Sequence, residues 1–220
     1  MQKNKKQAAF FDVDKTIVRG NTGQMYVMHF FLKGLINPIR AFLINFYVGC
    51  YMLNCIDYDK AMKKSYLIVK GWNVNAVKRL IKKHFQKKVK GCIYNSMRNV
   101  IEQHRKEKRL IVFVTNSWDI MTEDVALELK ADALIATRVG IKNNVFTGEV
   151  VSPNFGEYKR KNIKKFAKQH GIDLKNSYAY SDHISDVPML DSVGNPTAVN
   201  PDKNLLKYAA EKKWNILYPK

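Results

Sequence analysis

The stretch Ala8-Ala-Phe-Phe-Asp-Val-Asp-Lys-Thr-Ile17 decides the fold, because an apolar run stops at two aspartates two positions apart. An unpaired carboxylate inside a buried strand is costly, so this order predicts a strand that ends at a site. Alternate residues of an extended chain share a face, which lets Asp12 and Asp14 converge on one point. Two such carboxylates can take different roles, one as an ionised nucleophile and the other as a proton carrier. The alternative from this stretch alone is a strand ending in a turn that Asp14 or Thr16 caps.

The composition is that of a globular protein with one domain, or with a core and a sizeable insertion. The chain has 220 residues, of which 46% are hydrophobic. That is enough to bury a core and too apolar for a disordered chain. Its three cysteines, Cys50, Cys55 and Cys92, contain no Cys-x-x-Cys pair, which predicts neither a disulfide framework nor a zinc site. The basic start of the chain lacks the apolar run of a signal peptide, so we expect a cytoplasmic protein.

The net charge of +19 is concentrated in one region. Residues 60–109 hold sixteen lysines and arginines but only two acidic residues, Glu102 and Glu107. Solvated helix faces are the first interpretation of this run. A surface this basic also attracts anionic substrates, lipid head groups or nucleic acid, with an affinity that falls as salt rises. No aromatic-basic motif accompanies the charge, so no specific nucleic-acid binding is expected.

Strands and helices alternate after residue 110. The continuous apolar run Leu110–Val114 predicts a strand covered on both faces. The other predicted elements are helices at 118–130, 159–170 (stopping at Gly171) and 202–212, strands at Ala133–Ala136, Tyr178–Tyr180, Thr197–Val199 and Trp214–Leu217, and a hairpin turn at Asn143-Asn144. This alternation predicts an α/β fold with a Rossmann-like, doubly wound parallel sheet.

Residues 21–109 have helical spacing and contain no convincing strand. One stripe at helical spacing consists of Val77, Leu80, Ile81, His84 and Phe85. His84 on this stripe is expected to be a packed histidine rather than a ligand. We therefore predict a discontinuous core formed by residues 1–20 and 100–220, with residues 21–99 inserted as a helical cap.

Within the predicted cap, Met25–Ile56 is unusually apolar, above all Phe42–Leu53. The latter run is shorter than the ~20 apolar residues that span a bilayer. Pro38, Arg40 and Asn45 further weaken a membrane-spanning interpretation. Buried cap helices are the first interpretation. The alternative is a segment that meets a membrane interface or lines an apolar substrate pocket.

Polar residues follow the ends of several predicted strands. Thr115 and Asn116 follow the second strand, Asp182 and Asp186 follow a later one, and Lys159 opens a helix. Ligands of open α/β sheets bind beyond the carboxyl ends of the strands, so these groups can converge on one crevice. Clustered carboxylates repel one another unless a cation joins them, and oxygen ligands favour Mg²⁺. Mg²⁺, a lysine and a hydroxyl together form a receptor for a phosphoryl group.

The chain resembles the haloacid dehalogenase (HAD) superfamily phosphatases, in the subfamily IB branch that includes phosphoserine phosphatases. The resemblance lies in an ordered set of motifs: Asp12-Val-Asp14-Lys-Thr16, Thr115 after an apolar strand, Lys159, Asp182…Asp186 followed by Val-Pro-Met-Leu190, and the segment Gly194–Pro201. It covers the core almost end to end. The cap matches only in position and helical character.

This resemblance implies a role for each aspartate. Asp12 would attack phosphorus and form an aspartyl-phosphate. Asp14 would protonate the leaving alkoxide and then deprotonate the attacking water. Asp12, the backbone carbonyl of Asp14 and Asp182 would hold Mg²⁺.

The resemblance also implies how the phosphoryl group is bound. Thr115 and Lys159 would contact its oxygens, with help from the backbone N–H near Asn116. Asp186 would orient either the waters of the metal or Lys159. Thr16 would support the site.

The chain departs from the family pattern at several positions, of which Asn21 bears on the substrate. Lys15 and Ser181 stand where the family usually has glycine, and the Lys15 side chain is expected to point away from the site. At Asn21, phosphoserine phosphatases typically have a glutamate that meets the substrate's amino group. Phosphoserine is therefore not the substrate we expect.

The sequence thus predicts a Mg²⁺-dependent phosphatase that hydrolyses a small phosphomonoester through an aspartyl-phosphate. The first alternative is a lipid-phosphate phosphatase of the phosphatidylglycerophosphate or lysophosphatidate type, in peripheral contact with an anionic membrane. The others are a phosphotransferase with the same site and a basic non-enzymatic module that binds nucleic acid or membranes. The sequence predicts no oligomeric state.

Overall fold

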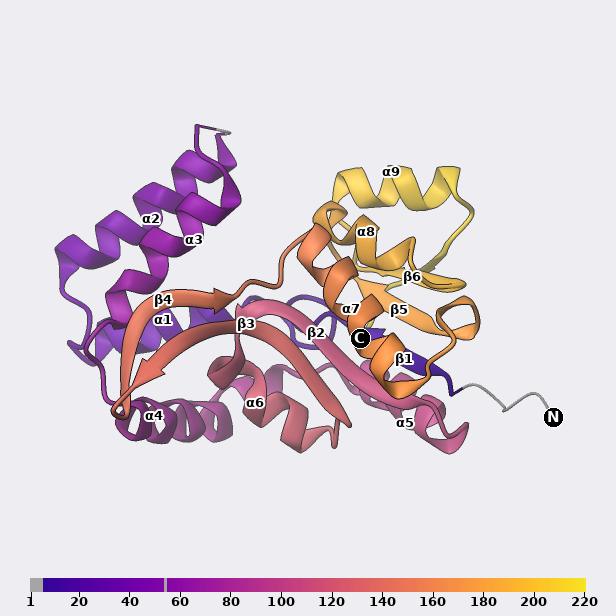
Figure 1. Ribbon diagram of the computed structural model, residues 1–220, viewed down its shortest axis with the longest axis horizontal. Coiled ribbons are helices and arrows are strands. Elements are labelled where there is room, and N and C mark those ends of the chain that lie inside the picture. Colours follow the sequence, from indigo (N-terminus) through magenta and orange to yellow (C-terminus); the bar gives the residue numbers. More distant parts are fainter. Residues whose placement is uncertain (1–5, 54) are drawn as a thin grey trace.

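A single seven-stranded sheet organises the computed structural model, which describes residues 6–53 and 55–220 (Figure 1). Its strand order is β4-β3-β2-β1-β5-β6-β7, parallel throughout except for the antiparallel β3–β4 hairpin. The strands are β1 (Ala8–Phe11), β2 (Leu110–Trp118), β3 (Ala133–Lys142), β4 (Val145–Ser152), β5 (Tyr178–Ser181), β6 (Asn195–Val199) and β7 (Asn215–Leu217). The predicted doubly wound α/β fold is confirmed.

The helices fall into two sets. Those between β1 and β2 are α1 (Thr22–Leu32), α2 (Pro38–Met52), α3 (Tyr58–Tyr66), α4 (Val74–Lys87) and α5 (Asn95–Lys106). Those after β2 are α6 (Asp119–Glu128), α7 (Glu157–His170), α8 (Val187–Leu190) and α9 (Lys203–Glu211). The helices predicted at 118–130, 159–170 and 202–212 correspond to α6, α7 and α9. The left-handed Gly171 (φ 65°) ends α7 as predicted.

Alternation along the strands divides the core between the two faces of the sheet. In β1, Ala8 and Phe10 belong to the cluster that α7, α8 and α9 cover, whereas Ala9 and Phe11 belong to the cluster on the other face. The second cluster includes residues of α1, α4, α5 and α6. Because both faces are covered, every residue of β1 is buried, and Asp12 leaves the strand inside the molecule.

The β3–β4 hairpin turns at Asn143 and Asn144, which have φ angles of 51° and 58°. Asparagine tolerates this left-handed region better than most residues, so the predicted turn is confirmed. The far end of the hairpin reaches the inserted helices (Figure 1). There the Gly71 N–H donates to the Phe146 carbonyl over 2.9 Å, and the Phe146 N–H donates to the Trp72 carbonyl over 3.0 Å.

Helices α1 to α4 occupy one side of the molecule, whereas α5 lies against β2 of the sheet (Figure 1). The predicted boundary at residue 99 falls inside the continuous helix α5, whose Met97 and Ile101 are buried in the core. The division between core and cap stays a prediction. His84 stacks on His29 of α1 at 4.1 Å between ring centroids, a packing contact of the kind expected for it. No helix in the described part of the chain combines the length and apolarity that crossing a bilayer requires.

Candidate active site

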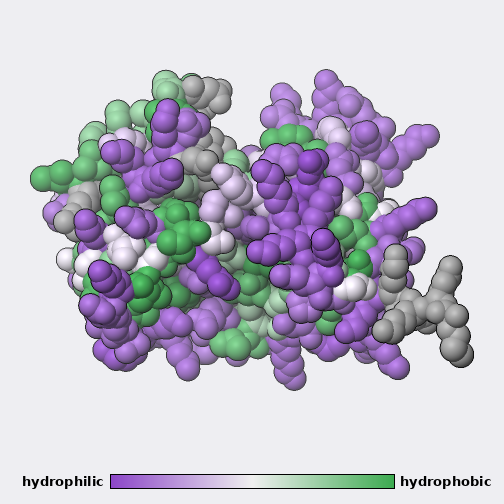
Figure 2. All heavy atoms as spheres, viewed as in Figure 1, coloured by the Kyte–Doolittle hydropathy of each residue, from purple (hydrophilic) through white to green (hydrophobic). Residues whose placement is uncertain are grey.

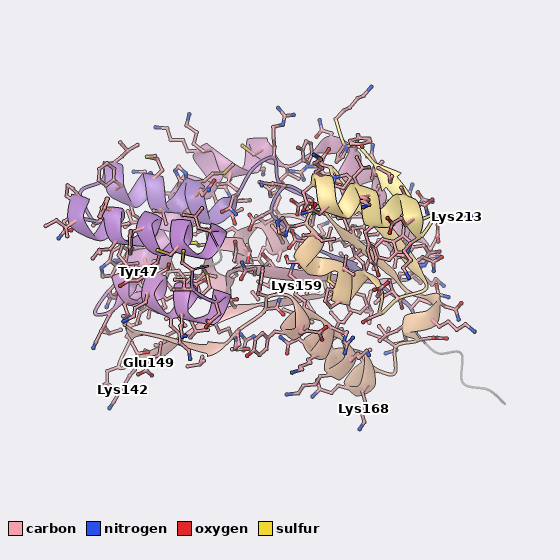
Figure 3. All side chains as sticks on the ribbon, turned by 90° about the horizontal axis from the view of Figure 1, so that it is seen from above. Tyr47, Lys142, Glu149, Lys159, Lys168 and Lys213 are labelled. Carbon is pink, nitrogen blue, oxygen red and sulfur yellow. The ribbon has the colours of Figure 1, made fainter. Side chains whose placement is uncertain are left out.

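Lys159 joins two carboxylates at the centre of the molecule (Figure 3). Its ammonium lies 2.6 Å from Asp12 Oδ1 and 2.6 Å from Asp186 Oδ2. Its side chain is only 2% exposed. The Ser181 hydroxyl donates to Asp186 Oδ2 over 2.5 Å, so Asp186 is held from two sides. Elements far apart in the sequence, namely the ends of β1 and β5 and the start of α7, thus meet at one point.

Burial and the neighbouring charges of opposite sign shift the pKa values of Asp12 and Lys159 in opposite directions. Burial raises the pKa of Asp12 well above its usual value, and the positive charge of Lys159 offsets only part of the rise. Burial alone would lower the pKa of Lys159, but the negative charges of Asp12 and Asp186 raise it above its usual value. Lys159 therefore carries its positive charge at neutral pH, which is the state needed to bind a phosphoryl group.

The carboxylate of Asp14 is fixed separately from that of Asp12. The backbone N–H of Thr22, the first residue of α1, donates to Asp14 Oδ1 over 2.6 Å. The Ser117 hydroxyl donates to Asp14 Oδ2 over 2.5 Å. Because both oxygens are held, Asp14 has one orientation, as a group that passes a proton to a substrate requires.

A bulge in β2 brings Ser117 to this position. Thr115 pairs with Ala136 of β3 and Trp118 pairs with the next residue, Thr137, so Asn116 and Ser117 bulge from the ladder. This extends β2 beyond the strand predicted at Leu110–Val114. Sequence reasoning placed Thr115 and Asn116 in the site but gave Ser117 no role.

Thr115 is fully buried at the start of this bulge. Its hydroxyl oxygen accepts a hydrogen bond from the Ser117 N–H over 3.0 Å. Asn116, half-buried, lies between the two residues. Two of the residues predicted to bind phosphate, Thr115 and Asn116, therefore lie in the same short segment that orients Asp14.

Sequence reasoning missed Asn154, which joins three elements behind the site. Its fully buried amide donates to the carbonyl of Thr115 (2.8 Å) in β2 and to that of Ile135 (2.9 Å) in β3. Its side-chain oxygen accepts a hydrogen bond from Asn162 of α7 over 2.9 Å. Since α7 also carries Lys159, this amide ties the Thr115 end of β2 to the helix of the lysine. A Pro-Asn pair in a loop gives little signal for such a role.

Asp202 was also missed, although its position before a helix predicts an N-cap. Its Oδ1 caps α9, and its Oδ2 accepts a hydrogen bond from the Ile184 N–H over 2.7 Å. Its own N–H donates to the Asp182 carbonyl over 2.8 Å. Asp202 thus fixes the loop that holds Asp182 and Asp186. His183, in the same loop, is exposed, and its Nδ1 lies 2.9 Å from the Ser185 hydroxyl.

The predicted metal ligands, Asp12, Asp182 and the carbonyl of Asp14, fit a magnesium ion, because their carboxylates are buried and negatively charged when ionised. Asp12 and Asp182 are 5% and 7% exposed. Burial, reinforced by the charge of Asp186, raises the pKa of Asp182 to about 7. A bound divalent cation would offset the cost of burying the ionised carboxylates, and all of its protein ligands would be oxygen atoms. Among the described residues, no three His, Cys, Asp or Glu side chains could hold a metal ion by themselves. The predicted set needs only two side chains, together with the backbone carbonyl of Asp14.

The loop between β1 and α1 contains three residues that the sequence singles out. Thr16 is fully buried, and its hydroxyl has no hydrogen-bond partner among the described residues. Lys15 is exposed, and burial raises the pKa of Asp182 while the charge of Lys15 lowers it. That the Lys15 side chain points away from the site stays a prediction. Asn21 accepts a hydrogen bond from the Gln24 N–H over 2.9 Å and so caps α1.

Tyr26 of α1 contributes a second buried hydroxyl that has no partner among the described residues. Burial raises the pKa of Tyr26, and Asp124 and Asp14 raise it further. The phenol is therefore neutral, and it lies close enough to Asp14 to sense its charge. Tyr66 of α3 shows the same effect, because burial, Asp119 and Asp14 raise its pKa. Helices α1 and α3 thus bring tyrosines close enough to Asp14 to feel its charge.

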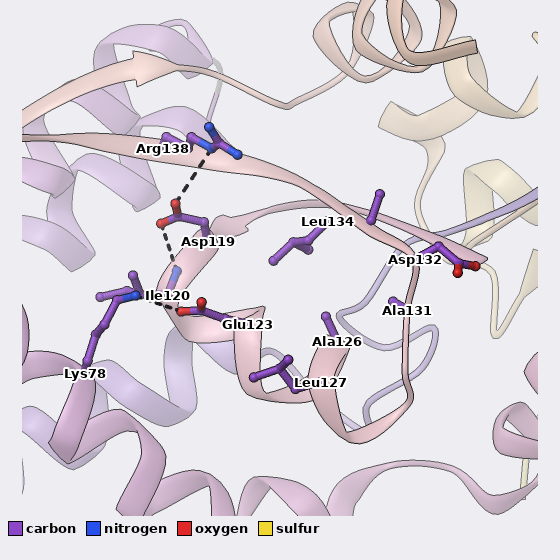
Figure 4. A pocket seen from close by; sticks show the side chains of 11 residues that line it. Lys78, Asp119, Ile120, Glu123, Ala126, Leu127, Ala131, Asp132, Leu134 and Arg138 are labelled. Atoms are coloured by element: carbon purple, nitrogen blue, oxygen red, sulfur yellow. Dashed lines mark hydrogen bonds and ion pairs between the residues drawn. The ribbon is translucent and has the colours of Figure 1, made fainter. Parts of the chain in front are cut away.

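A separate pocket of ≈ 350 Å³ lies between α6, β3 and Lys78 of α4 (Figure 4). Four of its charged lining residues form two ion pairs. Lys78 Nζ lies 3.0 Å from Glu123 Oε2, and Arg138 Nε lies 3.8 Å from Asp119 Oδ2. No predicted catalytic residue lines this pocket, so it is not part of the candidate active site.

Comparisons with known proteins agree with this geometry. The family model of the haloacid dehalogenase-like hydrolases matches residues 9–191. An "Inhibition of morphological differentiation protein" of Streptomyces azureus is 37% identical over 96% of this chain and 77% of its own length. A "Probable phosphatase" of Mycobacterium tuberculosis is 33% identical over 96% of this chain and 74% of its own length.

Among solved structures, a phospho-aspartyl intermediate analogue of phosphoserine phosphatase superimposes with a TM-score of 0.70. The alignment covers 99% of this chain and 95% of that one, at 20% identity, and so shows the shared fold. The predicted superfamily and the predicted enzyme class, a phosphatase, are confirmed. The chain belongs to the haloacid dehalogenase-like hydrolases.

Proposed function

We propose that this protein is a Mg²⁺-dependent phosphatase that hydrolyses a small phosphomonoester in two displacements. The observation that carries the proposal is the buried contact of Lys159 with Asp12 and Asp186, beside an Asp14 whose two oxygens are both held. One carboxylate lies against a cation and the other against neutral donors. This difference is what a nucleophile and a proton carrier require.

In the first displacement, a carboxylate oxygen of Asp12 attacks the phosphorus, and the bond from phosphorus to the ester oxygen breaks. Asp14 gives its proton to that oxygen, and the alcohol leaves. The product is an acyl phosphate on Asp12. The ammonium of Lys159 and the hydroxyl of Thr115 contact the phosphoryl oxygens and stabilise their charge.

In the second displacement, Asp14 takes a proton from a water molecule as the water attacks phosphorus. The bond from phosphorus to Asp12 breaks, inorganic phosphate leaves, and both aspartates return to their starting states. Asp12, Asp182 and the carbonyl of Asp14 would hold Mg²⁺. When bound, the ion neutralises the negative charge that builds up on the phosphoryl oxygens.

The Mycobacterium tuberculosis relative named a probable phosphatase supports this class of reaction. The identity of the substrate is inferred from residues of the inserted helices. Asn21 is engaged as the cap of α1 and has no carboxylate for an amino group. Phosphoserine is therefore disfavoured. The second candidate substrate is a lipid phosphate of the phosphatidylglycerophosphate or lysophosphatidate type, favoured by the exposed apolar side chains of α1 and α2.

The test is a phosphate-release screen with Mg²⁺ against sugar, amino-acid, nucleotide and lipid phosphomonoesters, the lipids presented in micelles. We expect release from at least one class by the wild type and none by Asp12→Asn, with unchanged folding by circular dichroism. Wild-type rates that equal those of Asp12→Asn for every class would refute the proposal. Transfer of phosphate to an added alcohol in place of water would identify a phosphotransferase.

A further inference from the structure

Two apolar stripes are exposed on consecutive elements of the cap. The first runs along α1 and past its end, and the second repeats the same i, i+3, i+4, i+7 spacing along α2. We name their eight side chains the apolar ridge: Met28, Phe31, Leu32, Leu35, Ile39, Phe42, Leu43 and Phe46. Leu32 is 74% exposed, Phe42 68% and Phe46 52%. The cap side of the molecule is correspondingly rich in hydrophobic surface (Figure 2).

The apolar ridge is not the face by which these helices join the core. α1 buries Tyr26 and Phe30 instead, on another side of the helix. α2 packs beside α3, away from the sheet (Figure 1). Along α2 the ridge is continuous, because the rings of Phe42 and Phe46 stack with centroids 6.4 Å apart. Contiguous apolar surface of this kind marks an interaction site on a folded protein.

The charged residues near the apolar ridge favour an anionic partner. No aspartate or glutamate occurs between Asp14 and Asp57, so the whole ridge-bearing segment lacks acidic residues. Exposed lysines occur on the same part of the molecule, with Lys33 between the two helices and Lys63 and Lys64 on α3, which packs beside α2. Apolar side chains bordered by lysines fit a bilayer with anionic head groups. A second copy of this chain fits poorly, since each copy carries a net charge of +19.

We propose that α1 and α2 dock this protein on the surface of an anionic lipid bilayer, with the apolar ridge inserted among the head groups. The helices lie in the interface and do not cross it, in agreement with the lack of a spanning helix in the described chain. This inference goes beyond the proposed phosphatase reaction and does not require a lipid substrate. It gives the exposed hydrophobic side chains of the cap a role of their own.

The test is sedimentation of the whole protein with phosphatidylcholine vesicles, with and without phosphatidylglycerol, at about 0.1 M and about 0.5 M NaCl. The higher salt concentration screens the general attraction of a basic protein, so the binding that remains reports the ridge. We expect Phe42→Ser/Phe46→Ser to bind at least tenfold more weakly at high salt, since the two inserted rings together are worth more than about 1.4 kcal/mol. Leu127→Ser is the matched control, because Leu127 is 69% exposed on α6.

Three results would overturn the proposal. The first is equal binding by wild type and double variant at high salt, and the second is complete loss of wild-type binding there. The third is a dimer, seen by light scattering, that the double variant abolishes. Hydrolysis of a soluble phosphomonoester should be the same in the double variant and the wild type. An inactive wild type that still binds vesicles would refute the phosphatase proposal alone.

Discussion

Ser117 donates its hydroxyl hydrogen to Asp14 over 2.5 Å, although the two residues are 103 positions apart in the chain. The contact exists because β2 bulges after Thr115 and turns Ser117 toward the end of β1. The same hydroxyl accepts a hydrogen bond from Thr22 of α1 over 3.3 Å. One serine thus connects Asp14, the bulge in β2 and the first helix of the insertion.

Replacing Ser117 tests whether this contact positions Asp14. Ser117→Ala removes one of the two donors to the carboxylate, so the carboxylate can rotate away from the leaving group. We expect kcat to fall about tenfold, the worth of one such hydrogen bond, with KM nearly unchanged. Ser117→Thr keeps a hydroxyl and should restore most of the rate. Equal rates in Ser117→Ala and the wild type would show that Thr22 alone holds Asp14.

Lys159→Met tests the central cation. The substitution keeps the shape of the side chain but leaves Asp12 and Asp186 buried without their positive partner. We expect phosphate release to be lost and the free energy of unfolding to fall by about 3 kcal/mol. Lys164→Met, on an exposed position of the same helix, should change neither quantity. Urea unfolding and a phosphate assay measure both, and an active Lys159→Met would contradict the role given to the ammonium.

Asn154→Ala tests the amide that joins β2, β3 and α7. It leaves the buried carbonyls of Thr115 and Ile135 without their side-chain donor, so we expect a loss of about 2–3 kcal/mol in unfolding free energy. Asn162→Ala removes a more exposed partner and should cost about 1 kcal/mol. A double-mutant cycle gives their coupling, and losses that add without coupling would show that the 2.9 Å contact contributes nothing.

The sequence predicts the centre of the site well because the relevant signals are local. Asp12 follows an apolar run, and Asp186 lies four positions after Asp182, just beyond another strand. In an open α/β sheet such positions meet at one edge whatever the details of packing. Lys159 carries no local signal, since basic residues surround it, and only its order among the motifs identifies it.

The supporting residues could not be predicted, because their partners are distant in sequence. The bulge that takes Asn116 and Ser117 out of the ladder is set by the pairing of β2 with β3, which no local pattern encodes. Asn154 acts through carbonyls of two different strands, and backbone carbonyls have no sequence signature. The exposed stripe on α2 was expected first as a buried helix face, since spacing alone does not say which surface covers it.

Lys15→Gly tests backbone strain at the site. Lys15 has a φ of 56°, in the left-handed region that favours glycine, and its side chain is exposed. We expect this variant to gain about 1 kcal/mol in unfolding free energy. Lys130 has a φ of 50° far from the aspartates, and Lys130→Gly should gain a similar amount. Thermal unfolding of both variants gives the comparison, and a loss of stability in Lys15→Gly alone would mean that the Lys15 side chain stabilises the loop.

His104 of α5 should make stability depend on pH. Its Nδ1 lies 3.0 Å from a guanidinium nitrogen of Arg109, which can only donate, so Nδ1 accepts. The remaining ring hydrogen is then on Nε2, which lies 2.7 Å from the Tyr180 hydroxyl. Burial, with the charge of Arg109, lowers the pKa of His104 to about 4. The folded protein therefore holds this imidazole neutral.

An unfolded chain protonates a histidine near pH 6.5, whereas folded His104 resists protonation down to about pH 4. Between these values the unfolded state binds the extra proton, so unfolding free energy falls as pH falls through the window. The full contribution, on the order of 2–3 kcal/mol, is present above about pH 6.5. His104→Gln has no titrating ring. Urea unfolding from pH 7.5 to pH 4.5 should therefore show that its unfolding free energy falls less steeply with falling pH than that of the wild type, by roughly one proton taken up on unfolding. Parallel slopes would mean that His104 titrates alike in the folded and unfolded states.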